Sequence, residues 1–178
     1  NNRNNAKLFK VANFKPENLF LHETDDGRKS SLIVNSRDPT KQDDPSDTTL
    51  DLTSYQLHDI ESVELPPNLT ELDLTANRLS SLDPRIGHLS NLKKLSLRQN
   101  LVEDTAVDPI SHWEALSGLE ELVLRDNKLM KVPDVSIFRR LLVFDISFNE
   151  INSLNGMSKV SDTLKELYVS KNEMTKME

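Results

Sequence analysis

The chain has 178 residues and a formal net charge of −7, with 29 acidic side chains against 22 basic ones. This length fits one domain with a tail, and the acidic balance argues against a nucleic-acid partner, which requires a basic face. No run of 18 apolar residues is present, so we expect neither a membrane-spanning helix nor a membrane partner.

The first 46 residues show no sustained hydrophobic period. They begin with Asn-Asn-Arg-Asn-Asn and contain two runs of turn-forming residues, at 25–27 and 43–46. A segment of this composition buries too little apolar surface to offset the entropy lost on ordering. We therefore predict that residues 1–46 form a disordered extension with at most a transient turn, and that a folded domain spans 47–178.

From residue 47 onward, one short apolar pattern recurs about six times. Five copies are anchored on an asparagine, and the earliest copy has Tyr55 instead; the intervals between anchors are 22, 23, 27, 22 and 23 residues. The anchors are Asn77, Asn100, Asn127, Asn149 and Asn172. Apolar residues stand eight, five and three positions before each asparagine and two after it. This LxxLxLxxNxL pattern is typical of leucine-rich repeats.

The repeat predicts the fold. Each LxL segment is expected to form a short strand whose two apolar residues point inward. One copy cannot cover its own apolar face, so the copies stack strand beside strand, and the asparagine amide satisfies backbone groups in the turn. The predicted fold class is α/β, a leucine-rich-repeat solenoid. We expect a right-handed curved superhelix with short parallel strands on the concave face and 3₁₀ or irregular returns on the convex face.

The 27-residue interval contains an insertion with helical character. Asp108 followed by Pro109 is a favourable helix start, and 110, 113 and 116 are apolar at helical spacing before Gly118, a favourable helix stop. We predict one short helix here on the convex face. Trp113 fits core packing better than it fits a partner-binding anchor.

The strands place two columns of side chains on the concave face. The central column, between the inward-pointing residues, is Asp51, Asp73, Ser96, Val123, Asp145 and Tyr168. The next column is Thr49, Glu71, Lys94, Glu121, Val143 and Glu166. Aspartate is disfavoured in strands, so its repeated use favours a binding face over a merely solvated one. A rigid strip of mixed charge with an aromatic suits protein recognition, and its acids favour a basic patch on the partner.

Signals for chemistry are missing from the sequence. The four histidines are scattered without metal-ligand spacing, and neither a Gly-rich phosphate loop nor a GxSxG motif occurs. We therefore expect no enzyme activity, no metal or other cofactor and no small-molecule substrate.

Three strings carry a family resemblance. LSLRQNLVE (95–103), VFDISFNEI (143–151) and LDLTSYQLHDIESVELP (50–66) resemble repeats of the leucine-rich-repeat regulatory subunits of protein phosphatase 1. The resemblance covers residues 48–178, and the long interval with HWEAL is similar to the plant form. It implies a non-catalytic subunit that binds the phosphatase catalytic subunit through its concave face and controls it, without a metal of its own.

The resemblance also suggests contact residues and a location. Carried over by position, it implies Asp145 and Tyr168 as partner contacts, where the family often has Phe at the second position. The further candidates from the two columns are Asp51, Asp73, Glu121 and Glu166. Later repeats of the family supply other contacts, so the chain is interpreted as an N-terminal fragment without its last repeats and cap. The family implies a cytoplasmic and nuclear location. The lack of cysteine agrees with this, because secreted repeat proteins commonly carry disulfide caps.

Two other classes remain open. A cytoskeletal or ciliary adaptor that engages dynein or tubulin would share the 22-residue period, but not the strings quoted above. A ligand domain of an immune sensor is disfavoured by the missing cysteines and the short repeats.

Overall fold

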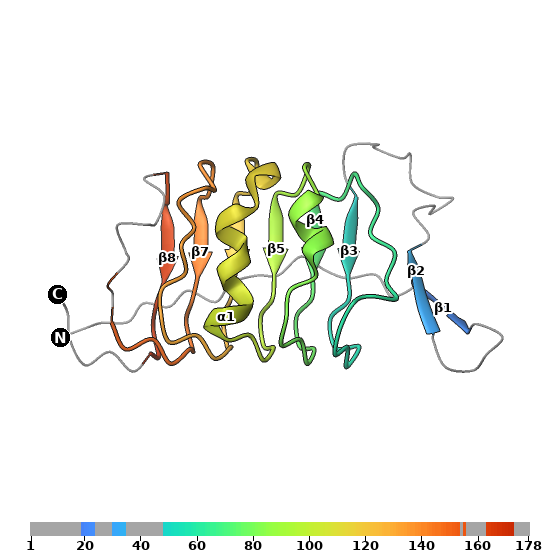
Figure 1. Cartoon of the computed structure of the whole chain (residues 1–178), viewed down its shortest axis with the longest axis horizontal. Coiled ribbons are helices and arrows are strands. Elements are labelled where there is room, and N and C mark those ends of the chain that lie inside the picture. Colours follow the sequence, from blue (N-terminus) through green and yellow to red (C-terminus); the bar gives the residue numbers. More distant parts are fainter. Residues whose placement is uncertain (1–18, 24–29, 35–47, 154, 156–162, 173–178) are drawn as a thin grey trace.

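The computed structural model describes residues 19–23, 30–34, 48–153, 155 and 163–172. Its main feature is a six-stranded sheet in the order β3-β4-β5-β6-β7-β8, in which every neighbouring pair is parallel (Figure 1). The strands are β3 (Thr49–Asp51), β4 (Glu71–Asp73), β5 (Lys94–Ser96), β6 (Glu121–Val123), β7 (Val143–Asp145) and β8 (Glu166–Tyr168). Strand order follows chain order because each repeat adds one strand beside the previous one.

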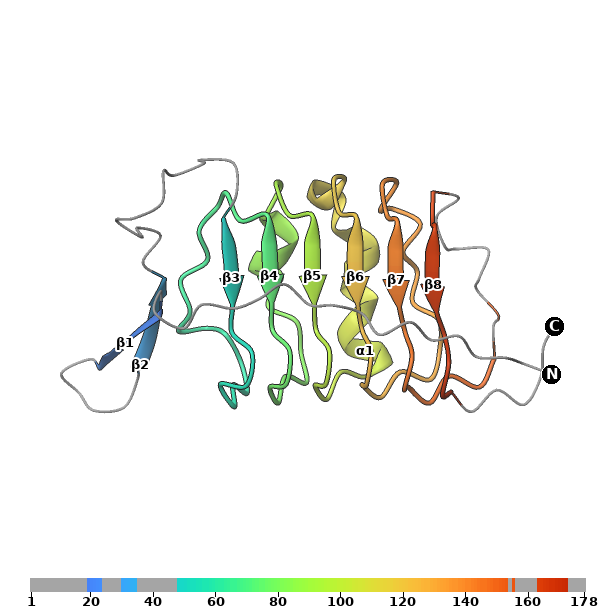
Figure 2. The same cartoon turned by 180° about the vertical axis from the view of Figure 1, so that it is seen from behind.

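The strands and the helices occupy opposite faces of this stack. The helices lie toward the viewer in Figure 1 and the strands toward the viewer in Figure 2. The helical elements are η2 (Pro84–His88), α1 (Asp104–Val107), η3 (Asp108–His112) and η4 (Glu114–Leu116). Three of the four are 3₁₀ helices, as short return segments favour. We call the two sides the strand face and the helical face.

Leucines from all repeats form one continuous core between the two faces. The middle residue of each strand from β3 to β7 is at most 2% exposed, and so is the apolar residue that follows the strand. These residues are Leu50, Leu52, Leu72, Leu74, Leu95, Leu97, Leu122, Leu124, Phe144 and Ile146. This confirms the predicted leucine-rich-repeat fold, with its parallel strands and its irregular and 3₁₀ returns.

The anchor asparagines bond neighbouring repeats to each other. Nδ2 of Asn77 donates to Leu52 O at 2.9 Å in the previous repeat and to Leu74 O at 3.0 Å in its own. Its Oδ1 accepts the N–H groups of Tyr55 at 3.1 Å and Leu57 at 3.0 Å. Asn100, Asn127, Asn149 and Asn172 repeat this pattern with the same three-residue step to their own strand. The backbone groups in the turns therefore have the asparagine hydrogen bonds that the sequence predicted.

The insertion is helical, but its helix begins earlier than the sequence predicted. The α-helical turn is 104–107, and residues 108–112 and 114–116 are 3₁₀. Asp108 makes no capping hydrogen bond; it ends the first turn, where its N–H donates to Asp104 O. The earlier start brings Val107 into the core. Trp113 is buried as predicted and lies between η3 and η4.

Two strands lie within the segment that was expected to be disordered. β1 (Leu19–Glu23) and β2 (Ser30–Val34) pair antiparallel, with Leu19 opposite Val34. Both runs are rich in residues that favour strands, and Asp25-Asp26-Gly27 between them is a turn signal. The lack of a long hydrophobic period therefore did not reveal this pair of short strands. Residues 1–18, 24–29 and 35–47 lie outside the described residues, so the prediction for them remains a prediction. Met174 of the sixth repeat lies outside them too.

Candidate functional site on the strand face

Register brings the predicted site residues onto one surface. Asp51 pairs with Asp73 on β3 and β4, and Asp145 pairs with Tyr168 on β7 and β8. These four lie in the central column. The outer column is Thr49, Glu71, Lys94, Glu121, Val143 and Glu166, and it is also in register. Glu121 and Glu166 therefore stand two strands apart with Val143 between them. The six candidates form two groups, one at each end of the sheet, rather than one cluster.

The central aspartates have a structural role that the sequence did not reveal. Oδ1 of Asp51, Asp73 and Asp145 each accepts a backbone N–H two residues later, at 2.9 Å in all three cases. The donors are Thr53, Thr75 and Ser147. Each carboxylate thus accepts a hydrogen bond from a backbone N–H at the point where the strand ends and the turn begins. The fold therefore explains part of the repeated use of aspartate, from which the sequence predicted a binding face.

In two of these aspartates the second carboxylate oxygen has no hydrogen bond within the described part of the chain, although in Asp145 it lies in an ion pair with Arg125. Oδ2 of Asp73 and Oδ2 of Asp145 have no hydrogen-bond partner among the described residues, although the side chains are only 6% and 0% exposed. Burial raises the pKa of Asp73, and the charge of Asp51 adds to that rise, while hydrogen bonds from Thr75 oppose it. A buried carboxylate oxygen without a donor is costly. These oxygens would gain most from a donor brought by a partner.

Beside Asp145 lies a stacked arginine–phenylalanine pair. The Arg125 guanidinium carbon is 4.3 Å from the centroid of the Phe148 ring, and Nη1 of Arg125 is 3.8 Å from Oδ2 of Asp145. The Arg125 side chain is 11% exposed, whereas Phe148 is 41% exposed. Sequence reasoning missed Phe148. The available signal was an aromatic in the position before an anchor asparagine, where the other copies have Ala, Gln, Asp or Lys.

The outer column carries the more accessible charges. Lys94 lies 3.5 Å from Glu71 and 4.0 Å from Glu121. Burial raises the pKa of Glu121 and Lys94 counteracts the rise. At the last strand, the hydroxyl of Tyr168 donates to Glu166 at 2.9 Å, and burial together with this bond raises the pKa of Tyr168. The two ion pairs of Lys94 are partly exposed, and pairs of this kind add little stability, so Glu71 and Glu121 are available to a partner.

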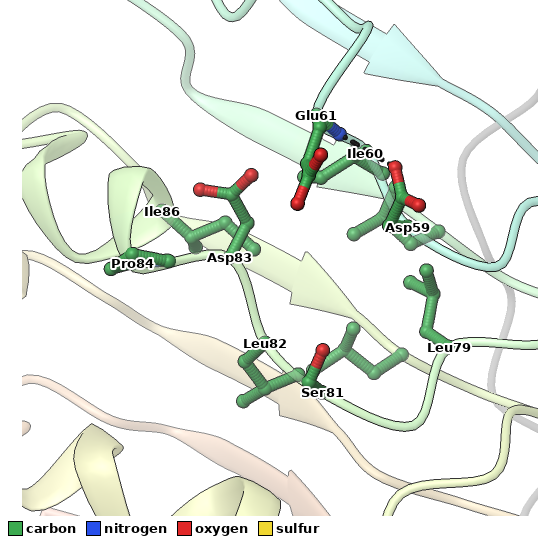
Figure 3. Close-up of a pocket in the computed structure, with 11 residues that line it drawn as sticks. Asp59, Ile60, Glu61, Leu79, Ser81, Leu82, Asp83, Pro84 and Ile86 are labelled. Atoms are coloured by element: carbon green, nitrogen blue, oxygen red, sulfur yellow. Dashed lines mark hydrogen bonds between the residues drawn. The ribbon is translucent and has the colours of Figure 1, made fainter.

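A small pocket lies away from these columns, between the first two repeats (Figure 3). Its volume is about 110 Å³, and Asp59, Glu61 and Asp83 stand around an apolar floor. Two of these three carboxylates make contacts within the local chain. Asp59 accepts the N–H of Glu61 at 3.0 Å, and Asp83 pairs with Arg85 at 2.9 Å, which lowers the pKa of Asp83. The Asp59 and Asp83 carboxylates are therefore already engaged in local contacts.

Within 48–153, 155, 163–172 and the two short strands, no group of three or more His, Asp or Glu side chains is arranged to hold a metal ion. None of the helices in those same residues has the length and apolar character needed to cross a membrane.

Comparison with known proteins agrees with the fold and with the resemblance of the strings. The leucine-rich-repeat family model matches residues 67–116. The chain is 72% identical over 143 residues to the protein phosphatase 1 regulatory inhibitor subunit PPP1R7 homolog of Arabidopsis thaliana, covering 77% of this chain and 44% of that protein. It is 30% identical to the protein phosphatase 1 regulatory subunit SDS22 of Saccharomyces cerevisiae, over 54% of this chain and 28% of that protein.

A third relative represents another class. Tubulin-folding cofactor E of Arabidopsis thaliana is 29% identical over 75% of this chain and 27% of its own length. The chain therefore spans less than half of each of these relatives. With the repeat geometry described above, the chain belongs to the leucine-rich-repeat proteins. Within that class, its similarity to the regulatory subunits of protein phosphatase 1 confirms the resemblance that its sequence strings indicated.

Proposed function

We propose that this chain is part of a non-catalytic regulatory scaffold that binds the catalytic subunit of protein phosphatase 1 through its strand face. The identity of 72% to a plant protein named as a phosphatase 1 regulatory subunit carries this proposal. A rigid row of parallel strands with its side chains in register supports it, because such a surface holds its contacts in place before binding. We also propose that the protein works in the cytoplasm and nucleus, with a protein as its partner rather than nucleic acid, membrane or a small molecule.

The candidate contacts differ in how readily a partner can reach them. Glu166 is exposed, Glu121 is half-buried, and Tyr168 is 9% exposed at the edge strand of the described sheet. Asp145 is fully buried and its Oδ2 is ion-paired with Arg125, so a donor from the partner reaches this oxygen only if the side chains around it move. We therefore place the first electrostatic contact at the two glutamates and regard Asp145 as a later, buried contact. Acidic groups on the rim of an interface chiefly accelerate association with a basic patch.

The test is a calorimetric titration of the full chain with purified phosphatase catalytic subunit. We expect measurable binding by the wild type. A triple variant with Glu121→Gln, Glu166→Gln and Tyr168→Ala should bind about tenfold more weakly, because it loses two attractive charges and one aromatic contact. The glutamine changes retain side-chain length, and circular dichroism would verify that the repeats stay folded after truncation of the buried Tyr168.

A matched control removes two acids elsewhere. Glu64→Gln with Glu114→Gln changes the net charge as much as the two strand-face glutamines do, and both residues are exposed and lie outside the strand-face columns. This variant should bind like the wild type. Equal weakening of both variants would show a nonspecific charge effect, and undetectable binding by the folded wild type would contradict the proposed partner.

The second candidate function is tubulin binding, favoured by the similarity to tubulin-folding cofactor E over three quarters of the chain. The same titration with tubulin dimers distinguishes the two. Binding to tubulin without binding to the phosphatase would replace the first proposal with this one.

A further inference from the structure

We propose that Phe148 is an additional aromatic anchor for the partner at the rim of the strand face, and that Arg125 is the residue that positions its ring. This inference rests on the proposed function and extends it to residues that the family strings did not single out as contacts. The Phe148 ring would pack against an apolar or aromatic side chain of the phosphatase catalytic subunit.

The backbone at Phe148 is unfavourable for a bulky residue. Its φ is 55°, in the left-handed region that side chains with a large Cβ substituent rarely adopt. The residue before every anchor asparagine has this conformation, with φ between 55° and 58°. The other copies use Ala76, Gln99, Asp126 and Lys171. The repeat thus requires the conformation but not an aromatic ring, so the fold alone does not explain phenylalanine here.

Burial does not explain the ring either. Phe148 is 41% exposed, whereas Phe144, Ile146 and Ile151 of the same repeat are at most 1% exposed. The core of this repeat is therefore complete without the Phe148 ring. An apolar side chain that is held in a strained conformation and left in solvent is a recognised sign of a functional position.

Arg125 holds the ring from one side. Its guanidinium lies 4.3 Å from the ring centroid and is itself tied to Asp145 at 3.8 Å. Because the arginine side chain is only 11% exposed and its Nη1 is fully covered, it cannot serve as the main contact for an incoming anion. It instead supports the aromatic ring through a cation–π contact. A ring fixed before binding loses little entropy when a partner packs on its open side.

The position of Phe148 is continuous with the candidate site. Phe148 N–H donates to Ser170 O at 3.0 Å, two residues beyond Tyr168 on the neighbouring chain segment. It also follows Asp145 by three residues. A single partner that covers the central column at β7 and β8 would therefore meet the Phe148 ring at the end of those strands. Because the two surfaces are continuous, the protein that contacts Phe148 is the partner already proposed for the strand face.

The decisive variant is Phe148→Asn, because Asn tolerates the left-handed conformation better than Phe. The full chain carrying it should unfold at the same or a higher denaturant concentration than the wild type. Its affinity for the purified phosphatase catalytic subunit, measured by calorimetry, should fall about tenfold, as for the loss of an aromatic anchor. A structural role would give the opposite pair of results, lower stability with unchanged affinity, and would overturn the inference.

Met130→Asn is the matched control. Met130 is an apolar residue in the preceding repeat that is 51% exposed, and its φ is not positive. Its affinity should match the wild type, and an equal loss at Met130 would overturn a specific role for Phe148. If the wild type binds and the strand-face triple variant binds more weakly while Phe148→Asn does not, this inference alone fails. If the folded wild type does not bind, both proposals fail.

Arg125→Lys tests the positioning role. Lysine keeps the positive charge beside Asp145 but loses the flat guanidinium that stacks on the ring. The change should weaken binding when residue 148 is Phe, and have little further effect when Phe148→Asn is already present. Independent, multiplicative losses in the double variant would show that Arg125 does not act through the ring.

Discussion

At the scale of single residues, Asn100 shows how one side chain connects two repeats. Its Oδ1 accepts the N–H of Leu79 at 3.0 Å, and its Nδ2 donates to Leu74 O at 2.9 Å and to Leu97 O at 3.0 Å. The side chain is buried. An amide is the one neutral side-chain group that can donate twice and accept at the same place, which is why the repeat keeps asparagine here.

We predict that Asn100→Ala lowers the free energy of unfolding by about 3 kcal/mol, because it leaves one N–H and two carbonyl groups buried without their partner. Chemical denaturation followed by circular dichroism measures the change. Asn91→Ala, at an exposed position in the same repeat, is the control and should shift the midpoint little. A loss below about 1 kcal/mol at Asn100 would mean that the freed groups find other partners.

The residues that every repeat shares could be predicted from the sequence, whereas contacts made by a single residue in one repeat could not. The inward leucines and the role of the asparagines follow from a periodic pattern, which reports what each repeat shares. The hydrogen bond that the Ser147 N–H donates to Asp145 and the exposure of Phe148 do not follow from it. Both depend on where individual side chains turn after the strand, and the pattern treats those positions as variable.

At the scale of elements, the helical face depends on a close contact between two return segments. A Cβ added to Gly87, in η2, would lie 2.6 Å from Cδ1 of Trp113, at the junction of η3 and η4. The indole therefore packs directly against the backbone of the preceding repeat. The insertion is thus part of the core, and the packing interpretation of Trp113 explains both its burial and the need for glycine opposite it.

We predict opposite outcomes for two glycine substitutions on this face. Gly87→Ala should lower the free energy of unfolding by about 2 kcal/mol, because the indole must move out of a well-packed position. Gly118→Ala introduces a Cβ with nothing within 4 Å, and should be neutral or stabilising by up to about 0.5 kcal/mol. Thermal and chemical denaturation of the two variants side by side provide the measurement. Equal effects would show that the Trp113 contact is easily rearranged.

Helix boundaries were the least predictable elements. The strands were located to within one residue, each beginning one position before the predicted LxL segment, because their apolar positions recur in every repeat. The insertion occurs once and had only local capping signals. Its true start depends on tertiary contacts: Oδ1 of Asp104 accepts the N–H groups of Met130 at 3.1 Å and Lys131 at 3.2 Å in the next repeat. Such a contact, 26 residues away in the chain, is invisible to a motif around Asp108.

At the scale of the whole molecule, each repeat contacts chiefly its neighbours, so stability should vary along the stack. The described sheet has β3 and β8 at its edges and four strands paired on both sides. Near β8 the repeat positions Leu164, Leu167 and Val169 are only partly buried, whereas their equivalents near β6 are at most 2% exposed. Those equivalents are Leu119, Leu122 and Leu124.

We therefore predict a gradient in amide hydrogen exchange for the free chain. Amides of residues 92–102 and 119–129 should exchange slowest, and amides of 163–172 at least about tenfold faster, because the edge repeat opens without unfolding its neighbours. Mass spectrometry of peptic fragments measures this directly. Adding the phosphatase catalytic subunit should slow exchange most at 163–172 if the strand face near β8 is bound. Uniform exchange across all repeats would instead show that the stack opens only as one cooperative unit, and the nearest-neighbour description of its stability would be wrong.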